Sequence, residues 1–180
     1  GMRACLQEKS QQLSSECYDE VASRVRQKMA GAERKAQPKM DAEMRALGAI
    51  EHSYGSDPLQ KLDFYKAEGR TSNAPLIVFV HGGGWKRGDK RNATGAAKIK
   101  HYRTSGYAFA SINYPLVPGA TVEQQAGDVA NAIAYLRGKS AALGIDSSRI
   151  VLMGHSAGAH LSALVGTDPQ YLQKAGLRFS

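Results

Sequence analysis

The chain has 180 residues, of which 42% are hydrophobic, so it is long enough to bury one core. Its 24 basic and 16 acidic residues give a formal net charge of +8. The basic residues are dispersed and the densest group, residues 86–91, contains an acid, which argues against a nucleic-acid partner. No stretch approaches the roughly 20 apolar residues of a membrane span, so no membrane span is expected.

The first residues carry little information on location. Gly1 before Met2 is typical of a residue left by recombinant expression, and no apolar core of signal-peptide length follows. We therefore expect a cytoplasmic protein, although a chain that has already lost a signal peptide would look the same. Cys5 and Cys17 form neither a disulfide framework nor a metal-ligand spacing, and we expect both to be small core residues of a helix.

Residues 1–48 differ from the rest in being rich in Gln, Lys, Arg, Glu and Ala. Pro38 is expected to start a second, shorter helix, which Gly48 would end. We therefore predict a helical N-terminal extension over residues 1–48 and a main domain over residues 49–180. Apolar residues recur in the extension at helical spacing: Leu13, Cys17, Val21, Val25 and Met29.

From residue 49 onward, strand and helix patterns alternate. Helices are predicted over 92–104 and from Val122 to Leu136, where residues 121–124 form a capping box. This alternation predicts a mostly parallel α/β sheet with helices on both faces. The predicted strands are 49–54, 61–66, 76–80, 107–113 and 150–153.

The sequence Gly-His-Ser-Ala-Gly at residues 154–158 follows the last predicted strand directly. A strand that passes into a helix through a very tight turn holds a serine in a strained conformation with its hydroxyl exposed. Side chains at Gly154 and Gly158 would collide with neighbouring backbone, and the N–H of Ala157 could face a developing oxyanion. The pattern predicts that Ser156 is a nucleophile; the alternative is a chance match in a glycine-bearing loop.

The sequence His-Gly-Gly-Gly-Trp at residues 81–85 follows another apolar strand. Glycines let the backbone turn its amides inward, so Gly83 and Gly84 are the predicted oxyanion donors. His81 is expected to brace the loop and Trp85 to pack beside the acyl site. The alternatives are an ordinary glycine-rich turn and a phosphate-binding loop, whose typical Gly-Lys-Ser/Thr or Gly-x-Gly-x-x-Gly patterns are missing here.

No convincing base or acid accompanies the serine. His155 is expected to support the loop with its ring turned away from the Ser156 hydroxyl, and His160 to pack on the following helix. The acids that precede or flank predicted helices are expected to cap helices or lie on the surface. Because the order in this fold class is serine, acid, histidine, both partners are expected beyond Ser180. The acids concerned are Asp89, Asp128, Asp146 and Asp168.

Three segments carry a family resemblance: residues 81–85, residues 114–118 (Tyr-Pro-Leu-Val-Pro) and residues 154–158. Over residues 50–178 the chain resembles the hormone-sensitive-lipase-like and kynurenine-formamidase-like esterases of the α/β-hydrolase superfamily. The resemblance implies the N-terminal part of an α/β-hydrolase fold, with no metal and no organic cofactor. It also implies the roles already expected of its site residues: Ser156 as nucleophile, and Gly83, Gly84 and Ala157 as the oxyanion hole.

The residues that carry the resemblance do not include the last sheet strands, the acid and the histidine of this family. The strand before Ser156 would therefore lie at an open sheet edge. A second copy in a homodimer, another partner or a further C-terminal segment is expected to cover that edge. The expected function is hydrolysis of small acyl or aryl esters through an acyl-enzyme on Ser156. The alternatives are an arylformamidase, a serine peptidase and a catalytically incomplete hydrolase-fold scaffold.

Overall fold

The computed structural model describes residues 15–91 and 94–178 and divides the chain into two compact units, Gly1–Asp41 and Ala42–Ser180. Helix α2 (Ser15–Ala46) continues through Pro38, so the predicted new helix at Pro38 is wrong. Proline removes one helical hydrogen bond, but strong helix formers (Ala, Lys, Gln, Arg and Met) surround it in this segment. The chain leaves the helix at Gly48, with φ +81°, as predicted.

The structure leaves untested part of the predicted apolar stripe of the N-terminal segment and the expectation that both cysteines are core residues. Leu13 and Cys5 lie outside the described residues, as do the side chains of Cys17 and Met29. Of the remaining members of the predicted apolar stripe, Val21 is half-buried and Val25 is exposed. None of the described helices combines the length and the apolar character that crossing a bilayer requires.

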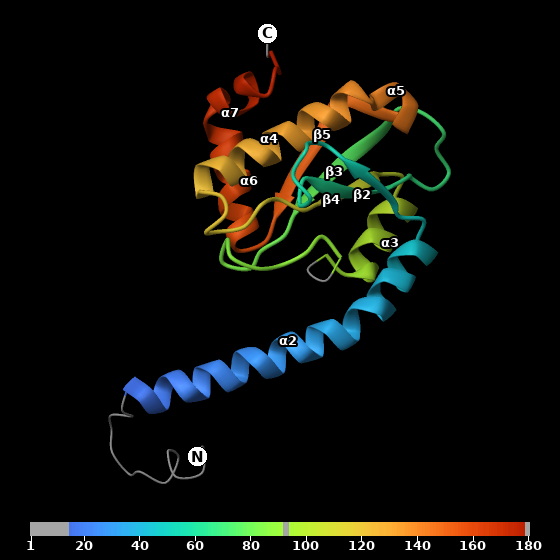
Figure 1. Cartoon of the computed structure of the whole chain (residues 1–180). Coiled ribbons are helices and arrows are strands. Elements are labelled where there is room, and N and C mark those ends of the chain that lie inside the picture. Colours follow the sequence, from blue (N-terminus) through green and yellow to red (C-terminus); the bar gives the residue numbers. More distant parts are fainter. Residues whose placement is uncertain (1–14, 92–93, 179–180) are drawn as a thin grey trace. The chain divides into compact units, whose positions relative to one another are not determined.

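The second unit contains a five-stranded sheet with the order β1-β2-β4-β3-β5 (Figure 1). β3 pairs in parallel with both β4 and β5, whereas β1 and β2 run antiparallel at the other side of the sheet. The parallel arrangement predicted from the sequence therefore holds for β3, β4 and β5, and the sheet as a whole is mixed. The strands are β1 (Ile50–Ser53), β2 (Lys61–Tyr65), β3 (Ala74–Val80), β4 (Ala108–Ile112) and β5 (Ile145–Gly154).

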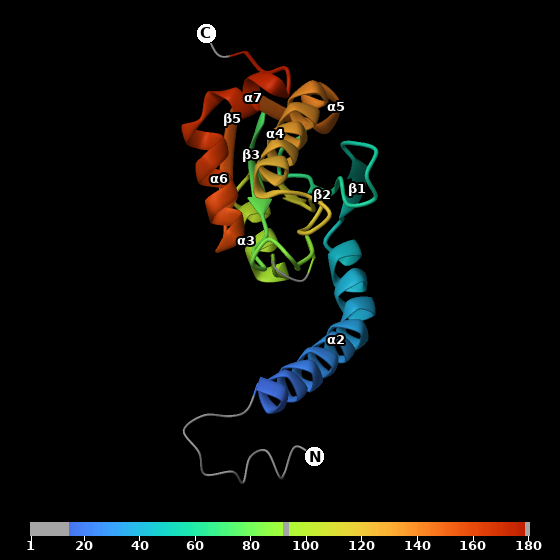
Figure 2. The same cartoon turned by 60° about the vertical axis from the view of Figure 1, so that its left-hand side comes forward.

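Helices cover both faces of this sheet, as predicted (Figures 1 and 2). The described helices of the second unit that follow α2 are α3 (Ala96–Thr104), α4 (Val122–Gly138), α5 (Ser140–Leu143), α6 (Ala157–Thr167) and α7 (Pro169–Lys174). α4 and α6 lie on one face and α3 on the other. The sequence patterns missed α5 and α7, and β5 begins five residues before the predicted strand.

The alternating side chains of β3 divide the core into two layers. Leu76, Val78 and Val80 pack with residues of α4 and α6, while Ile77 and Phe79 pack with Ile99 of α3 and with residues of β2 and β4. The side chains of these five residues of β3 are each at most 2% exposed. A strand buried on both faces explains why this segment is a continuous apolar run.

A buried ion cluster ties the loop after β3 to the antiparallel strands. Asp63 of β2 is fully buried and accepts a hydrogen bond from Arg91 Nε at 2.6 Å. Lys90 Nζ lies 3.2 Å from Asp63 and 2.9 Å from Glu51 of β1. We name Glu51, Asp63, Lys90 and Arg91 the Asp63 cluster. It explains how a charged residue can occupy the interior face of β2, because a buried charge needs paired partners.

Side chains of β4 and the residue after it hold the same loop through its backbone. Asn113 accepts a hydrogen bond from the Lys90 amide and donates to Asp89. The Ser111 hydroxyl donates to the Lys90 carbonyl at 2.7 Å. The loop that begins at the glycine motif is therefore held firmly at its far end.

Replacing Asp63 with Asn is expected to lower the free energy of unfolding by about 3–5 kcal/mol, because Lys90 and Arg91 would lose their buried anion and keep the exposed Glu51. Urea denaturation followed by circular dichroism measures this loss. Asp146→Asn is the matched control, since Asp146 pairs with Arg149 at an exposed site and is expected to change stability little. Equal unfolding midpoints for the two variants would contradict the structural importance of the Asp63 cluster.

Candidate active site

Ser156 occupies a sharp turn between a strand and a helix. β5 ends at Gly154 and α6 begins at Ala157, and Ser156 between them has φ +52° and ψ −119°. A positive φ is rare for a residue with a side chain and usually persists only where the surrounding structure enforces it. The Ser156 side chain is exposed, so its hydroxyl is accessible.

Close backbone contacts explain the two glycines of this turn. A Cβ atom on Gly154 would collide with the Gly158 carbonyl, and a Cβ atom on Gly158 would collide with the carbonyl of Val80 at the end of β3. The steric reason predicted for both glycines is therefore confirmed. The contacts also show that the turn at Ser156 packs directly on the strand that leads into the glycine motif.

The glycine motif lies against Ser156. A Cβ atom built on Gly82 would lie 2.7 Å from the His155 carbonyl oxygen, 3.1 Å from His155 Nδ1 and 3.2 Å from Ser156 Cβ. Only glycine allows this approach without displacing the serine turn. No separate role was predicted for Gly82, because its position among three consecutive glycines was the only signal in the sequence.

Three amides near this contact have no partner. Within residues 15–91 and 94–178, the N–H groups of Gly83, Gly84 and Ala157 donate no hydrogen bond. Gly83 and Gly84 have φ values of +129° and +61°. A Cβ atom on Gly83 would also collide with the Arg87 carbonyl. The loop that contacts the serine turn through Gly82 thus carries backbone donors that no described residue uses.

His81 is buried beneath this loop. Its Nδ1 lies 2.8 Å from the Gly82 carbonyl oxygen, and its ring stacks on Tyr114 with centroids 4.5 Å apart. The Tyr114 hydroxyl donates to the His81 carbonyl at 2.7 Å. Burial lowers the pKa of His81 from its usual 6.5, which favours the neutral ring. These contacts support the bracing role expected for His81 and add Tyr114 as its partner.

Trp85 ends the motif with an unusual backbone conformation, φ +63°. Its half-buried ring meets the edge of His160, with centroids 5.5 Å apart. Its carbonyl accepts hydrogen bonds from the Val117 amide and from Gln125 Nε2, both at 2.9 Å. Gln125, a residue of α4 that the sequence patterns did not single out, is therefore part of the support of this loop.

No histidine activates Ser156 within the described part of the chain. The Ser156 hydroxyl makes no hydrogen bond to any described residue. The rings of His52, His81 and His160 contact Tyr135, Tyr114 and Trp85 respectively. A general base must lie within hydrogen-bond reach of the nucleophile and be oriented by a third group. The described residues therefore hold a nucleophile-like serine and unpaired amides without a base.

The acidic residues have structural partners. Asp168 caps α7 by accepting a hydrogen bond from the Gln170 amide, as expected. Asp128 differs from expectation, because it lies buried within α4 and accepts a hydrogen bond from Gln60 at 2.7 Å. Its burial raises the pKa of the carboxyl group. The strongly helical pattern around Asp128 could not reveal that its face turns toward the β1–β2 hairpin.

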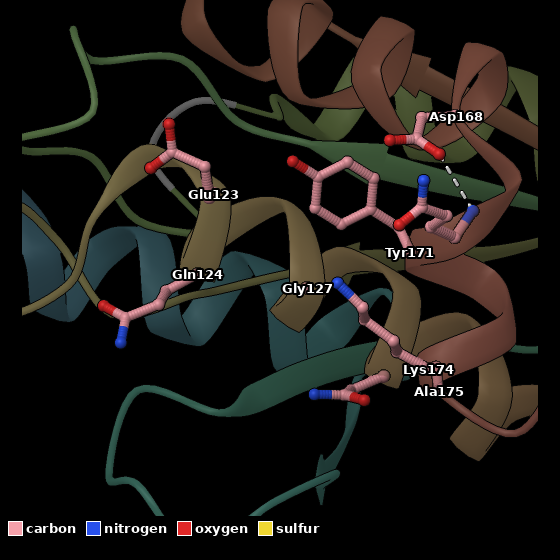
Figure 3. A pocket seen from close by; sticks show the side chains of 9 residues that line it. Glu123, Gln124, Gly127, Asp168, Tyr171, Lys174 and Ala175 are labelled. Carbon is pink, nitrogen blue, oxygen red and sulfur yellow. Dashed lines mark hydrogen bonds between the residues drawn. The ribbon is translucent and has the colours of Figure 1, made fainter.

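Figure 3 shows a pocket of about 450 Å³ between α4 and α7, separate from the serine turn. Glu123, Asp168, Tyr171 and Lys174 are among the residues that line it, and neither Ser156 nor the glycine motif does. The described residues also contain no cluster of three or more His, Cys, Asp or Glu side chains that could hold a metal ion.

Comparison with known proteins places this site in a family. The sequence model of the BD-FAE family matches residues 62–175. Esterase LipC of Mycobacterium tuberculosis is 38% identical over 122 residues, which cover 66% of this chain and 30% of LipC. Kynurenine formamidase of Drosophila melanogaster is 29% identical over 123 residues, which cover 68% of this chain and 40% of the formamidase.

A solved structure agrees with these relatives. The butyrate-bound esterase Est2 of Thermogutta terrifontis superposes with a TM-score of 0.59 at 29% identity, covering 65% of this chain and 44% of Est2. The chain thus spans less than half the length of each of these proteins. Because the BD-FAE match covers most of the chain and the fold agrees with that of a solved esterase, the chain belongs to the BD-FAE family of the α/β-hydrolases.

Proposed function

We propose that the chain carries the nucleophile and the oxyanion hole of a serine carboxylic-ester hydrolase. The observation that supports this most strongly is the exposed Ser156 at positive φ, packed against Gly82 of a loop with unpaired amides. The Ser156 oxygen attacks the ester carbonyl carbon while its proton passes to a base. The carbon–oxygen bond to the alcohol then breaks, and the alcohol leaves with that proton.

The acyl-enzyme is cleared by water in a second addition. Water attacks the acyl carbon, the bond to Ser156 breaks, and the carboxylic acid departs as the serine regains its proton. In both steps the carbonyl oxygen becomes negative, and the amides of Gly83, Gly84 and Ala157 are the proposed donors to it. The N-terminus of α6, which begins at Ala157, adds a favourable dipole at the same place.

The relatives indicate the class of substrate. LipC is named an esterase, and the Est2 structure holds butyrate, a four-carbon acid. We therefore propose a small acyl ester as substrate. A formylated aromatic amine is the second candidate, because a kynurenine formamidase is among the relatives. Rates on phenyl butyrate and on an N-formyl anilide, measured with one preparation, separate the two classes.

The acid and the base of this reaction are proposed to come from outside the described residues. The support for this is that the Ser156 hydroxyl bonds to no described residue and that the rings of His52, His81 and His160 contact other side chains. β5 is also the last strand of the described sheet, and its Val151 is 49% exposed. A further segment would therefore both complete the chemistry and cover this edge.

Activity is tested on the protein extended by the segment proposed to supply the base, because the described residues contain none. In this protein Ser156→Ala is expected to abolish labelling by a fluorophosphonate, which forms a covalent bond only to an activated serine. Intact-mass measurement of the labelled protein, followed by peptide mapping, identifies the modified residue. Ser162→Ala is the matched control, because Ser162 lies on the same helix and its hydroxyl is bonded to the Gly158 carbonyl. If wild type of this extended protein labels no better than Ser156→Ala, Ser156 is not an activated nucleophile and the chain is a hydrolase-fold scaffold.

Gly84→Val is expected to lower kcat on the order of 10²-fold, because a branched side chain at φ +61° distorts the loop and removes one oxyanion donor. Hydrolysis of phenyl butyrate measures the effect. Gly69→Val imposes the same strain at φ +70° in a turn remote from the motif and is expected to leave kcat unchanged. An unchanged kcat in Gly84→Val would refute the assignment of this donor.

DNA sequencing past codon 180 is expected to reveal an open frame that encodes an acidic residue followed by a histidine. This order follows from the arrangement of the triad in this fold class. A native stop codon directly after Ser180 would contradict the expectation. In that case a second copy of the chain or another protein would have to cover β5 and supply the base.

A further inference from the structure

We propose that Gln125 is a positioning residue that holds the glycine loop in the conformation that presents its amides to substrate. The expected effect of Gln125 on catalysis rests on the proposed function. The hydrogen bond between Gln125 and the Trp85 carbonyl can be tested without measuring any reaction.

Gln125 connects two loops to one helix. It is fully buried on α4, and its Nε2 donates to the Trp85 carbonyl at 2.9 Å and to the Pro115 carbonyl at 3.0 Å. Trp85 belongs to the loop after β3 and Pro115 to the loop after β4. The Val117 amide donates to the same Trp85 carbonyl, so the two loops are also joined to each other.

The orientation of the Gln125 amide follows from these two carbonyls. Its Oε1 is buried and has no partner among the described residues. A buried acceptor without a partner costs free energy. The observed orientation must therefore be stabilised by the two hydrogen bonds that the NH₂ group donates. Turning the amide over would place its oxygen against two carbonyl oxygens. Glutamine thus supplies two donors where a carboxylate or an apolar side chain would supply none.

Trp85 needs such support because of its backbone. At φ +63° a tryptophan backbone is strained, and such a conformation persists only when its surroundings enforce it. Trp85 directly follows Gly84, one of the proposed donors. If the Trp85 carbonyl were released, the turn could relax and the Gly84 amide would lose the orientation proposed for an oxyanion donor. Gln125 would therefore act on the reaction through the loop and not by touching substrate.

The chain contains a single tryptophan, which makes the loop directly observable. Gln125→Met keeps the size of the side chain and removes both donors, and Gln125→Asn is the second variant should the first fail to fold. Val129→Ala is the matched control for stability, because it opens a cavity on the same helix and leaves both Gln125 hydrogen bonds in place. Gln173→Met makes the same chemical change at an exposed position of α7.

Trp85 emission and acrylamide quenching are measured on all four variants and on wild type of the 180-residue chain. The rate of Ser156 labelling is measured on the same set in the protein extended by the segment proposed to supply the base. In Gln125→Met the emission is expected to move to longer wavelength, quenching to rise, and labelling to slow on the order of 10²-fold. Both controls are expected to keep wild-type emission and to label at the wild-type rate.

Wild-type emission and quenching in Gln125→Met would overturn the proposal, as would an equal spectral change in Val129→Ala. A changed spectrum with an unchanged labelling rate would also overturn it, because the loop would then move without effect on the serine. If wild type labels no faster than Ser156→Ala, the proposed function fails, whereas the spectra still decide whether Gln125 holds Trp85.

Discussion

The whole site depends on one contact, in which the backbone of the β5–α6 turn packs directly on the end of β3 and on the loop that follows it. Gly158 lies against the Val80 carbonyl, and Gly82 lies against His155 and Ser156. Any side chain at either glycine would separate the hydroxyl from the amides. The parallel pairing of β3 with β5 brings the two segments to the same edge of the sheet, and the absence of two Cβ atoms brings them into contact.

Two residues next to this contact have strained backbones that the surrounding structure stabilises. Ser156 and Trp85 both have positive φ values, and each is held by groups distant in sequence. The serine turn is held between a strand and a helix, while Trp85 is held by Val117 and Gln125. Donors that are already oriented before substrate binds need no reorganisation during the reaction, which is the usual source of their catalytic effect. The rigidity of the loop is therefore a functional property as much as a structural one.

Most features that the sequence predicted correctly have a local physical cause. Gly154 is required by a contact with Gly158 inside the same turn, and the capping box at Thr121 is entirely local. Gly158 is an exception, because its steric requirement comes from Val80 of β3 and was predicted only from the serine motif in the sequence. The features that it missed depend on partners far away in the chain. Nothing near Gln125 indicates that its amide meets Trp85, and nothing near Asp128 indicates Gln60.

The errors in secondary structure have a similar origin. Pro38 is a strong local signal for a helix start, yet its strongly helical surroundings outweigh it. The early part of β5, from Ile145, is too polar to be recognised as a strand, and it is recruited by pairing with Ala74. β1 and β2 pair antiparallel because a short hairpin joins them. The alternation of side chains that predicts a strand does not predict the direction in which it pairs.

The Asp63 cluster has a consequence for the order of folding. Asp63 faces Lys90 and Arg91 only when β2 pairs with β4 in its observed register, opposite Ser111, because a shift by one residue would turn the carboxylate to the other face of the sheet. The glycine loop lies between these two strands in the chain, so its far end can be anchored only after a long-range pairing has formed. Such pairings are slow to form because a long segment must first be closed. A chain in which only the parallel strands have paired would therefore hold the Ser156 turn against Gly82 while the far end of the glycine loop is still unanchored.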